Sequence, residues 1–150
     1  MAETELPNEV EILLVEDNPN DVELTLRALK RNNLANLVHV VRDGEEALDY
    51  IYARGAYARR KGKIVPRVIF LDLKLPKVNG IEVLKQLKAD EDKRSIPVVV
   101  VTSSQEEPDV KECYKLGANS YIVKPVDFEK FVNAIAEVGL YWLILNKPPR

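Results

Sequence analysis

The amino-acid sequence predicts an α/β fold, a doubly wound parallel sheet of five strands accompanied by five helices. Five short aliphatic runs recur along the chain. The runs are nearly continuous rather than alternating, which is typical of parallel strands that are buried on both faces. Segments with apolar residues at helical spacing lie between them. This regular alternation of strand and helix favours right-handed crossovers within one sheet.

The predicted strands are rich in β-branched residues. They are EILLV (11–15), LVHVV (37–41), RVIFL (67–71), IPVVVV (96–101) and SYIVK (120–124). His39, the only histidine, lies in the second run and is interpreted as a strand residue. With no second histidine, His-based metal sites and Ser-His or Cys-His catalysis lose most of their support.

The predicted helices show apolar side chains at intervals of three and four residues. The first predicted helix covers Asp21 to Leu29, with Val22, Leu26 and Leu29 on one face, flanked by Leu24 and Ala28. The other stripes are EEALDYI after Asp43 and Gly44; Ile81, Leu84 and Leu87; Val110, Cys113 and Leu116; and Phe128, Phe131, Val132, Ile135, Val138 and Trp142. Gly117 is the expected C-terminal cap of the fourth helix, and Asp127 is the expected N-cap of the fifth. Cys113, the only cysteine, is expected to pack as a small apolar residue.

Length and composition predict one compact domain. The chain has 150 residues, is 46% hydrophobic and carries a net charge of -2. We expect a polar tail at 1–9, a folded domain at 10–146 and a short tail at 147–150. The mixed charges argue against direct nucleic-acid binding. Neither a signal peptide nor an apolar run long enough to cross a bilayer is present in the sequence, so we expect a cytoplasmic protein without membrane insertion.

One long irregular segment interrupts the alternation, from Ala53 to Arg67. It contains a basic cluster, composed of Arg59, Arg60, Lys61 and Lys63. We interpret it as a solvated loop, and the alternative is a docking surface for an acidic partner.

Polar residues follow the strands, where ligands bind in open α/β sheets. Glu16 and Asp17 follow the first run, and Asp72 follows the third. Thr102, Ser103 and Ser104 follow the fourth, and Lys124 and Pro125 close the fifth. Each alone is an ordinary solvated strand end, but together they predict one crevice that holds three carboxylates, a hydroxyl and an ammonium.

The carboxylates Glu16, Asp17 and Asp72 predict a site for a hard cation. Clustered carboxylates repel one another unless a cation lies among them. Oxygen ligands with room for water and phosphate suit Mg2+, or Mn2+ in its place. Asp72 is then the candidate nucleophile for an aspartyl phosphate, and Thr102 and Lys124 would stabilise the phosphoryl oxygens.

Four motifs lie at the ends of the predicted strands: VEDN after the first strand, LDLKLPKVNG around Asp72, VTSS after the fourth strand and VKP after the fifth. Together they closely resemble those of the receiver domain of two-component response regulators. The likeness covers about residues 10–144, with the motifs in family order. It implies the flavodoxin-like strand order 2-1-3-4-5, an order that one chemotaxis receiver exemplifies. It also implies a signalling protein rather than an enzyme.

The resemblance assigns roles to individual residues. Asp72 is implied as the phosphoacceptor, Glu16 and Asp17 as the acidic pair that holds Mg2+, and Lys74 as the donor of a backbone carbonyl to the metal. Thr102 and Tyr121 are implied as the switch pair, and Lys124 as the partner of the phosphate, followed by a cis bond to Pro125. Lys74 and Ser104 are implied to tune dephosphorylation.

The resemblance also implies partners. The long segment before the third strand and the C-terminal sequence YWLILNKPP are similar to small regulators of phytochrome-type sensor histidine kinases. We therefore expect a histidine kinase as phosphoryl donor. The chain ends soon after the fifth helix, so output is expected through protein contact at the surface of the fourth helix, fifth strand and fifth helix. The apolar residues Leu140, Tyr141 and Ile144 predict a homodimer there, and the alternative is a helix end packed onto its own domain.

Other functions fit the sequence less well. A phosphatase of the haloacid dehalogenase type needs a second acid two residues after the nucleophile, where Lys74 stands. A flavodoxin-like FMN carrier needs a phosphate cradle, whereas EDNPND has no glycine and its acids would repel phosphate. A receiver that only docks proteins, without phosphorylation, remains as the alternative.

Overall fold

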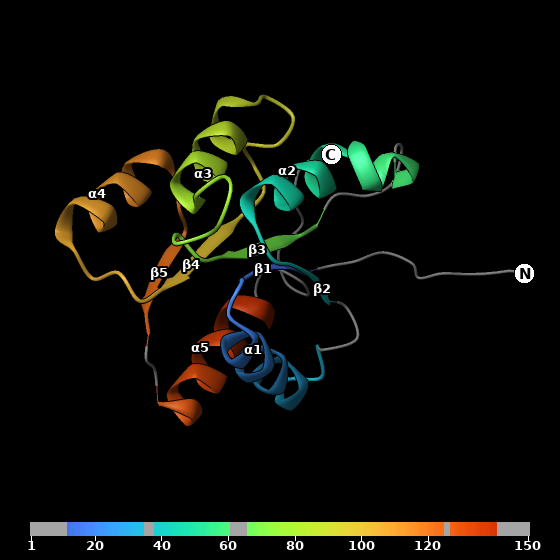
Figure 1. Ribbon diagram of the computed structural model, residues 1–150. Coiled ribbons are helices and arrows are strands. Elements are labelled where there is room, and N and C mark those ends of the chain that lie inside the picture. The colour runs from blue at the N-terminus through green and yellow to red at the C-terminus, as the bar shows by residue number, and fades with distance from the viewer. Residues whose placement is uncertain (1–11, 35–37, 61–65, 125–126, 141–150) are drawn as a thin grey trace, which may run out of the picture.

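The computed structural model describes residues 12–34, 38–60, 66–124 and 127–140. In these ranges five parallel strands form one sheet of order β2-β1-β3-β4-β5, which confirms the predicted fold class (Figure 1). The strands are β1 (Ile12–Val15), β2 (Val38–Val41), β3 (Val68–Leu71), β4 (Val98–Thr102) and β5 (Ser120–Val123). The helices are α1 (Pro19–Arg31), α2 (Gly44–Tyr52), the 3-10 helix η3 (Gly55–Arg60), α3 (Gly80–Ala89), α4 (Glu107–Leu116) and α5 (Phe128–Leu140). The expected domain limits at residues 10 and 146 lie outside the described residues.

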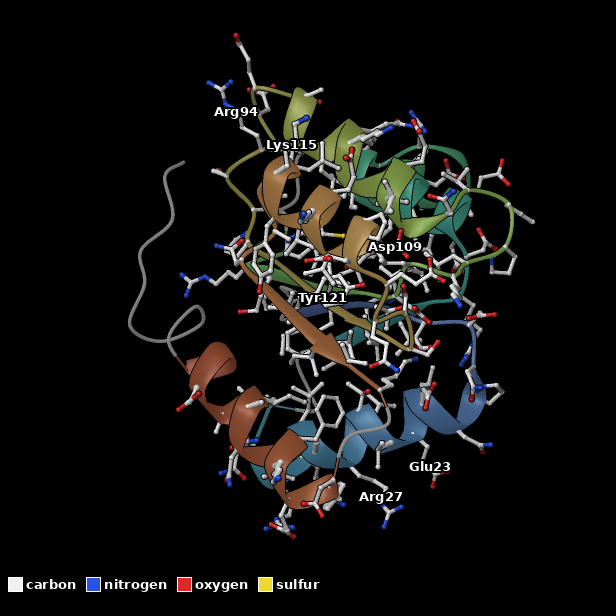
Figure 2. The ribbon with its side chains drawn as sticks, turned by 90° about the vertical axis from the view of Figure 1, so that its left-hand side faces the viewer. Glu23, Arg27, Arg94, Asp109, Lys115 and Tyr121 are labelled. Atoms are coloured by element: carbon white, nitrogen blue, oxygen red, sulfur yellow. The ribbon has the colours of Figure 1, made fainter. Side chains whose placement is uncertain are left out.

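The sheet is covered by helices on both faces, and β1 shows how one strand serves both layers. Leu13 and Val15 pack in the core under α2, α3 and α4, whereas Ile12 and Leu14 pack in the core under α1 and α5 (Figure 1). All four side chains are buried, as expected for a strand with two covered faces. Figure 2 shows β5 lying between α4 and α5. Within the described ranges, no helix has both the length and the apolar character of a membrane span.

Helix α1 begins two residues earlier than predicted, at Pro19 rather than Asp21. Asn18 is the N-cap, and its side chain accepts hydrogen bonds from the backbone N–H groups of Asn20 and Asp21. Proline is well suited to the first helical position because it needs no hydrogen-bond partner there. This earlier start places Asp21 in the first turn of the helix, and that position matters for the site.

The buried stripe of α1 also differs from the predicted one. Val22, Ala28 and Leu29 are buried, but the fourth buried residue is Thr25, and Leu26 is only half-buried. Apolarity alone placed Leu26 at the centre of the stripe. The spacing of three to four residues from Val22 through Thr25 to Leu29 gives the face that packs inward.

The predicted ends of α4 and α5 are confirmed. Gly117 ends α4 with a φ of 108°, a conformation that residues with a Cβ rarely adopt. The side chain of Asp127 accepts a hydrogen bond from the backbone N–H of Lys130 at 3.1 Å, as an N-cap does. Cys113 is fully buried, and burial together with the nearby charges of Asp109 and Glu112 raises the pKa of its thiol to about 11. Trp142 lies outside the described residues.

The first half of the segment 53–67 is largely exposed, as predicted for a solvated loop, but it is not irregular, because η3 forms there. The hydroxyl of Tyr57 donates to Glu46 Oε2 at 2.6 Å and lies 3.1 Å from Nε2 of His39. The His39 ring also stacks on Tyr50, with ring centroids 4.4 Å apart. These contacts anchor η3 to β2 and α2. Residues 61–65 and the side chain of Arg60 lie outside the described part of the chain, so the basic docking surface stays a prediction.

Candidate functional site

The carboxyl ends of four strands meet at one edge of the sheet. Backbone hydrogen bonds continue just past the strands: Glu16 N–H donates to Val41 O at 3.0 Å, Asp72 N–H to Val15 O at 3.1 Å and Lys124 N–H to Thr102 O at 2.7 Å. The sheet therefore fixes the backbone from which these polar side chains project.

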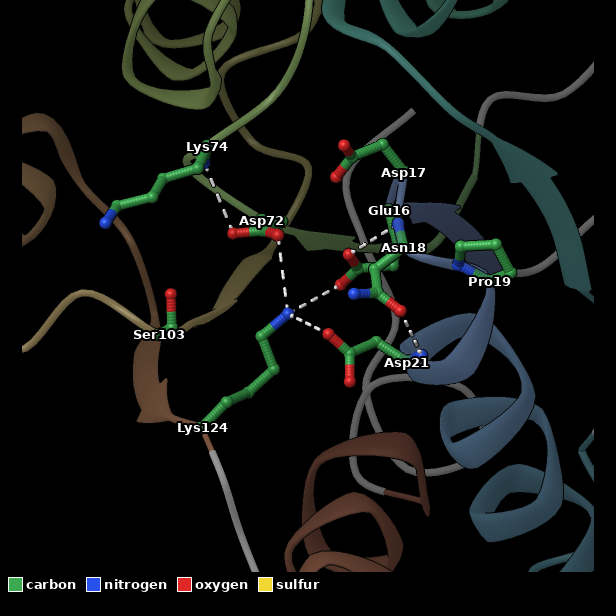
Figure 3. Close-up of a pocket in the computed structure, with 9 residues that line it drawn as sticks. All are labelled: Glu16, Asp17, Asn18, Pro19, Asp21, Asp72, Lys74, Ser103 and Lys124. Atoms are coloured by element: carbon green, nitrogen blue, oxygen red, sulfur yellow. Dashed lines mark hydrogen bonds and ion pairs between the residues drawn. The ribbon is translucent and has the colours of Figure 1, made fainter.

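The polar side chains line a pocket of about 620 Å³ (Figure 3). Its lining residues are Glu16, Asp17, Asn18, Pro19, Asp21, Asp72, Lys74, Ser103 and Lys124. The structure thus brings together six residues that the sequence predicted: Glu16, Asp17, Asp72, Lys74, Ser103 and Lys124. The pocket also contains Asp21, which the sequence did not single out.

Glu16, Asp17 and Asp72 form a carboxylate triad. Each offers one oxygen, and these oxygens lie within 4.8 Å of one another. Glu16 and Asp72 are only 3% and 6% exposed, whereas Asp17 is exposed to solvent. Buried carboxylates so close together raise each other's energy unless a positive charge compensates them. The three carboxylates supply hard oxygen ligands, and Asp17 faces the solvent. They can therefore hold a divalent cation that keeps some of its water ligands.

The ammonium of Lys124 is paired with three carboxylates of this pocket. Its Nζ lies 2.8 Å from Asp21 Oδ2, 3.0 Å from Glu16 Oε1 and 3.4 Å from Asp72 Oδ2 (Figure 3). Burial lowers the pKa of Lys124, but the hydrogen bonds to Asp21 and Glu16 and the charges of Glu16 and Asp72 raise it more, so the net direction is upward. Lys124 therefore stays protonated while it links α1, β1 and β3 to the end of β5.

Glu16 is the acid most affected by burial. Desolvation raises the pKa of its carboxyl, the hydrogen bond from Lys124 opposes this rise, and the charge of Asp72 adds to it, so that the net pKa rises from 4.5 to about 7. Its second oxygen accepts a hydrogen bond from the backbone N–H of Asn18 at 3.2 Å. The pocket therefore holds one carboxylate whose ionisation is costly until a cation is bound.

The loop after β3 positions Asp72. The backbone N–H of Lys74 donates to Asp72 Oδ1 at 3.3 Å, and the side chain of Lys74 extends away from the carboxylates (Figure 3). The loop returns so closely that a Cβ on Gly80 would lie 2.2 Å from the carbonyl oxygen of Asp72. Glycine at position 80 is therefore required for α3 to begin beside Asp72. Gly80 is the last residue of the motif LDLKLPKVNG, and no role for it was predicted from the sequence.

The predicted switch pair, Thr102 and Tyr121, is not among the residues that line the pocket. Thr102 is fully buried, and its Oγ1 lies 3.3 Å from the backbone N–H of Ser104. The hydroxyl of Tyr121 donates to the carbonyl oxygen of Ser104 at 2.9 Å. Ser104 itself donates its hydroxyl to Asp109 on α4 at 2.5 Å. Ser104 thus connects Thr102 at the end of β4 with Tyr121 on β5 and Asp109 on α4. The neighbouring Ser103, and not Ser104, lines the pocket.

Several predicted residues cannot be placed. Pro125, Tyr141 and Ile144 lie outside the described residues, and so does the side chain of Leu140. The cis bond and the dimer contact therefore stay predictions.

Fold and site together define the class of protein. The family described as the response regulator receiver domain matches residues 12–136. The chain belongs to this family. It is a signalling phosphoacceptor rather than an enzyme, and the acidic pocket at the strand ends agrees with that role.

Its relatives include response regulators of phytochromes. The chain is 58% identical to the bacteriophytochrome response regulator RtBRR, with a TM-score of 0.75 over 92% of this chain and 82% of that one. It is 37% identical to the phosphorylated cyanobacterial phytochrome response regulator RcpA, with a TM-score of 0.82 over 95% of this chain and 99% of that one.

A third relative, Rcp1, has been crystallised with a metal ion. Rcp1 of Synechocystis sp. is 36% identical over 88% of each sequence. The Mn2+-bound structure of Rcp1 has a TM-score of 0.80, with 34% identity over 93% of this chain and 98% of that one. A divalent cation site in this relative agrees with the carboxylate triad found here.

Proposed function

We propose that Asp72 accepts a phosphoryl group in a reaction that depends on Mg2+ or Mn2+. The observation that carries this proposal is the position of its buried carboxylate, which lies beside two further acids, with oxygens within 4.8 Å of one another, and 3.4 Å from the ammonium of Lys124. An oxygen of Asp72 attacks phosphorus, and a new O–P bond forms as the bond to the donor breaks. The donor keeps the electron pair of that bond. The leaving group is therefore the imidazole of the kinase histidine when the donor is a phosphohistidine, and acetate when the donor is acetyl phosphate.

The metal site is assigned to Glu16, Asp17 and Asp72, with the backbone carbonyl of Lys74 as a further ligand. The close oxygens and the costly ionisation of Glu16 support this assignment. When bound, the cation neutralises the carboxylates and the incoming phosphoryl oxygens. Lys124 supplies a second positive charge from β5, and Thr102 supplies a hydroxyl for a remaining phosphoryl oxygen.

The signal then passes through the segment after β4. Thr102 contacts Ser104, and Ser104 contacts both Tyr121 and Asp109. Movement of Thr102 toward the phosphoryl group would disturb these contacts and change the surface of α4, β5 and α5. Phosphorylation would thus add charge at one site and shift the surface of α4, β5 and α5 between two conformations.

The proposal is tested by the mass of the intact protein after incubation with acetyl phosphate. We expect one added phosphoryl group with Mg2+, none with excess chelator, and none on the Asp72→Asn variant. No addition under any condition would contradict the proposal and favour a receiver that acts only as a protein-docking module.

We further propose a sensor histidine kinase of the phytochrome type as the phosphoryl donor, supported by the similarity to RcpA and RtBRR. The test is transfer of labelled phosphoryl from an autophosphorylated phytochrome-type kinase, compared with a histidine kinase that has no phytochrome sensor. Transfer that is at least about tenfold faster from the first kinase is expected, and equal rates would contradict the assignment.

A homodimer through α4, β5 and α5 is proposed as the output form, with Leu140, Tyr141 and Ile144 at its contact. The half-exposed residues of β5 and the exposed ring of Tyr114 on α4 support an interface on this side. Sedimentation with and without the phosphate mimic beryllofluoride is the measurement. The dimer fraction is expected to rise with the mimic, and an unchanged monomer in both conditions would contradict the proposal.

A further inference from the structure

Lys124 contacts two carboxylates of the proposed metal site and one carboxylate outside it. An ammonium has three N–H donors. Within the described part of the chain, Lys124 is paired with Asp21, Glu16 and Asp72, and the contact to Asp21 is the shortest of the three. Glu16 and Asp72 belong to the carboxylate triad, but Asp21 does not. Asp21 is therefore the one partner of Lys124 that the proposed metal ligands do not include.

Asp21 is held in place independently of Lys124. Its backbone N–H donates to the Asn18 side chain at 3.2 Å, which fixes it in the first turn of α1. A carboxylate in the first turn of a helix is stabilised by the unpaired N–H groups there. Its side chain is 30% exposed, so it carries its charge at a lower cost than the buried Glu16 does. The structure thus provides a stable anionic partner for the lysine on the α1 side of the pocket (Figure 3).

A divalent cation and the ammonium of Lys124 compete for the same oxygens. Both are positive, and both contact the oxygens of Glu16 and Asp72 if the triad holds the metal. A lysine that bridges Glu16 and Asp72 opposes metal binding, whereas a lysine drawn toward Asp21 leaves these oxygens free. Loss of the Asp21 carboxylate also makes the pocket less negative. The return of Lys124 to Glu16 and Asp72 and the loss of negative charge would both weaken the binding of a divalent cation.

We propose that Asp21 is a positioning residue that draws Lys124 away from the carboxylate triad and thereby strengthens the binding of a divalent cation. The inference rests on the proposed function, because it uses the metal site assigned to Glu16, Asp17 and Asp72. It adds a fourth acid, on a different element, that acts on the metal site through the lysine.

The test is the Mg2+ dissociation constant, measured by calorimetry on the unphosphorylated protein. Asp21→Asn is expected to weaken Mg2+ binding roughly threefold to fivefold, the range of a partly exposed ion pair. Asp21→Ser, whose side chain is too short to reach Lys124, is expected to weaken it at least as much. Glu23→Gln is the matched control, because Glu23 is an exposed acid on the same helix that points away from the protein (Figure 2). Its effect should stay below about 1.5-fold in physiological salt.

A double-mutant cycle distinguishes positioning from simple loss of charge. In a Lys124→Met background, the effect of Asp21→Asn should shrink to the part that its lost charge contributes alone, and the difference between the two backgrounds measures the positioning of Lys124. Circular dichroism verifies that each variant is folded. An undiminished effect in this background, or no effect in the wild-type background, would overturn the inference and leave the proposed function standing. Absence of Mg2+ binding to the wild-type protein would instead overturn the proposed function and the inference with it.

Discussion

The buried carboxyl of Glu16 should make the metal-free protein less stable as the pH rises. Its pKa is 4.5 in an unfolded chain and about 7 in the folded one. The folded state therefore binds the proton more tightly, and the free energy of unfolding falls as the pH rises from 4.5 through 7. At about 1.4 kcal/mol per pKa unit, the difference between 4.5 and 7 corresponds to roughly 3 kcal/mol.

Glu16→Gln removes this cost while it keeps an oxygen near Lys124. We expect the variant to equal the wild type or fall slightly below it near pH 4.5, and to exceed it progressively up to pH 8, with a change of roughly 3 kcal/mol across that window. The assay is urea unfolding in chelator at several pH values, because subtraction of the two curves cancels the other titrating groups. Glu23→Gln is the control for loss of an exposed acid. Parallel curves for the wild type and Glu16→Gln would refute the reasoning.

Three further outcomes are expected in the pocket and in the segments next to it. Mg2+ binding at pH 7 should release roughly half a proton, because the cation ionises Glu16; calorimetry in buffers of different ionisation enthalpy measures this, and zero release would contradict it. Gly80→Ala should destabilise the protein by roughly 2 kcal/mol, since its Cβ would meet the carbonyl of Asp72, and thermal unfolding that matches the wild type would argue against this close approach. Lys74→Asn and Ser104→Ala should each change the dephosphorylation rate about twofold or more. Rates unchanged in both would reject that assignment.

The sequence predicted most of the site because the residues that end buried strands are easy to identify. Aliphatic runs mark β1 and β3, so Glu16 and Asp72 follow directly as strand-end residues. Parallel strands bring their carboxyl ends to one edge, which is why residues far apart in sequence could be assigned to one crevice. The pocket that contains Glu16, Asp17, Asp72 and Lys124 confirms this reasoning.

Asp21 was missed because a helix boundary was misplaced. With α1 predicted to begin at Asp21, that residue had no role beyond starting the helix. The Asn18 cap and Pro19 at the first position move the start back, and one turn then carries Asp21 into the pocket. The sequence contained the signal, since Asn followed by Pro is a strong helix start.

The helix η3 could not be predicted from local pattern. Its sequence is short and has no apolar periodicity. It is anchored by the hydroxyl of Tyr57, which contacts His39 from β2 and Glu46 from α2. Those contacts exist only once the sheet and α2 are in place, and this kind of tertiary context is absent from a single sequence.

The most direct test of the account is the position of the phosphoryl group in the chain. After incubation with acetyl phosphate and Mg2+, borohydride reduces an aspartyl phosphate to a stable alcohol that peptide mass spectrometry can locate. Modification is expected at Asp72 alone. Modification at Asp17 or Asp21 with an unmodified Asp72 would contradict it.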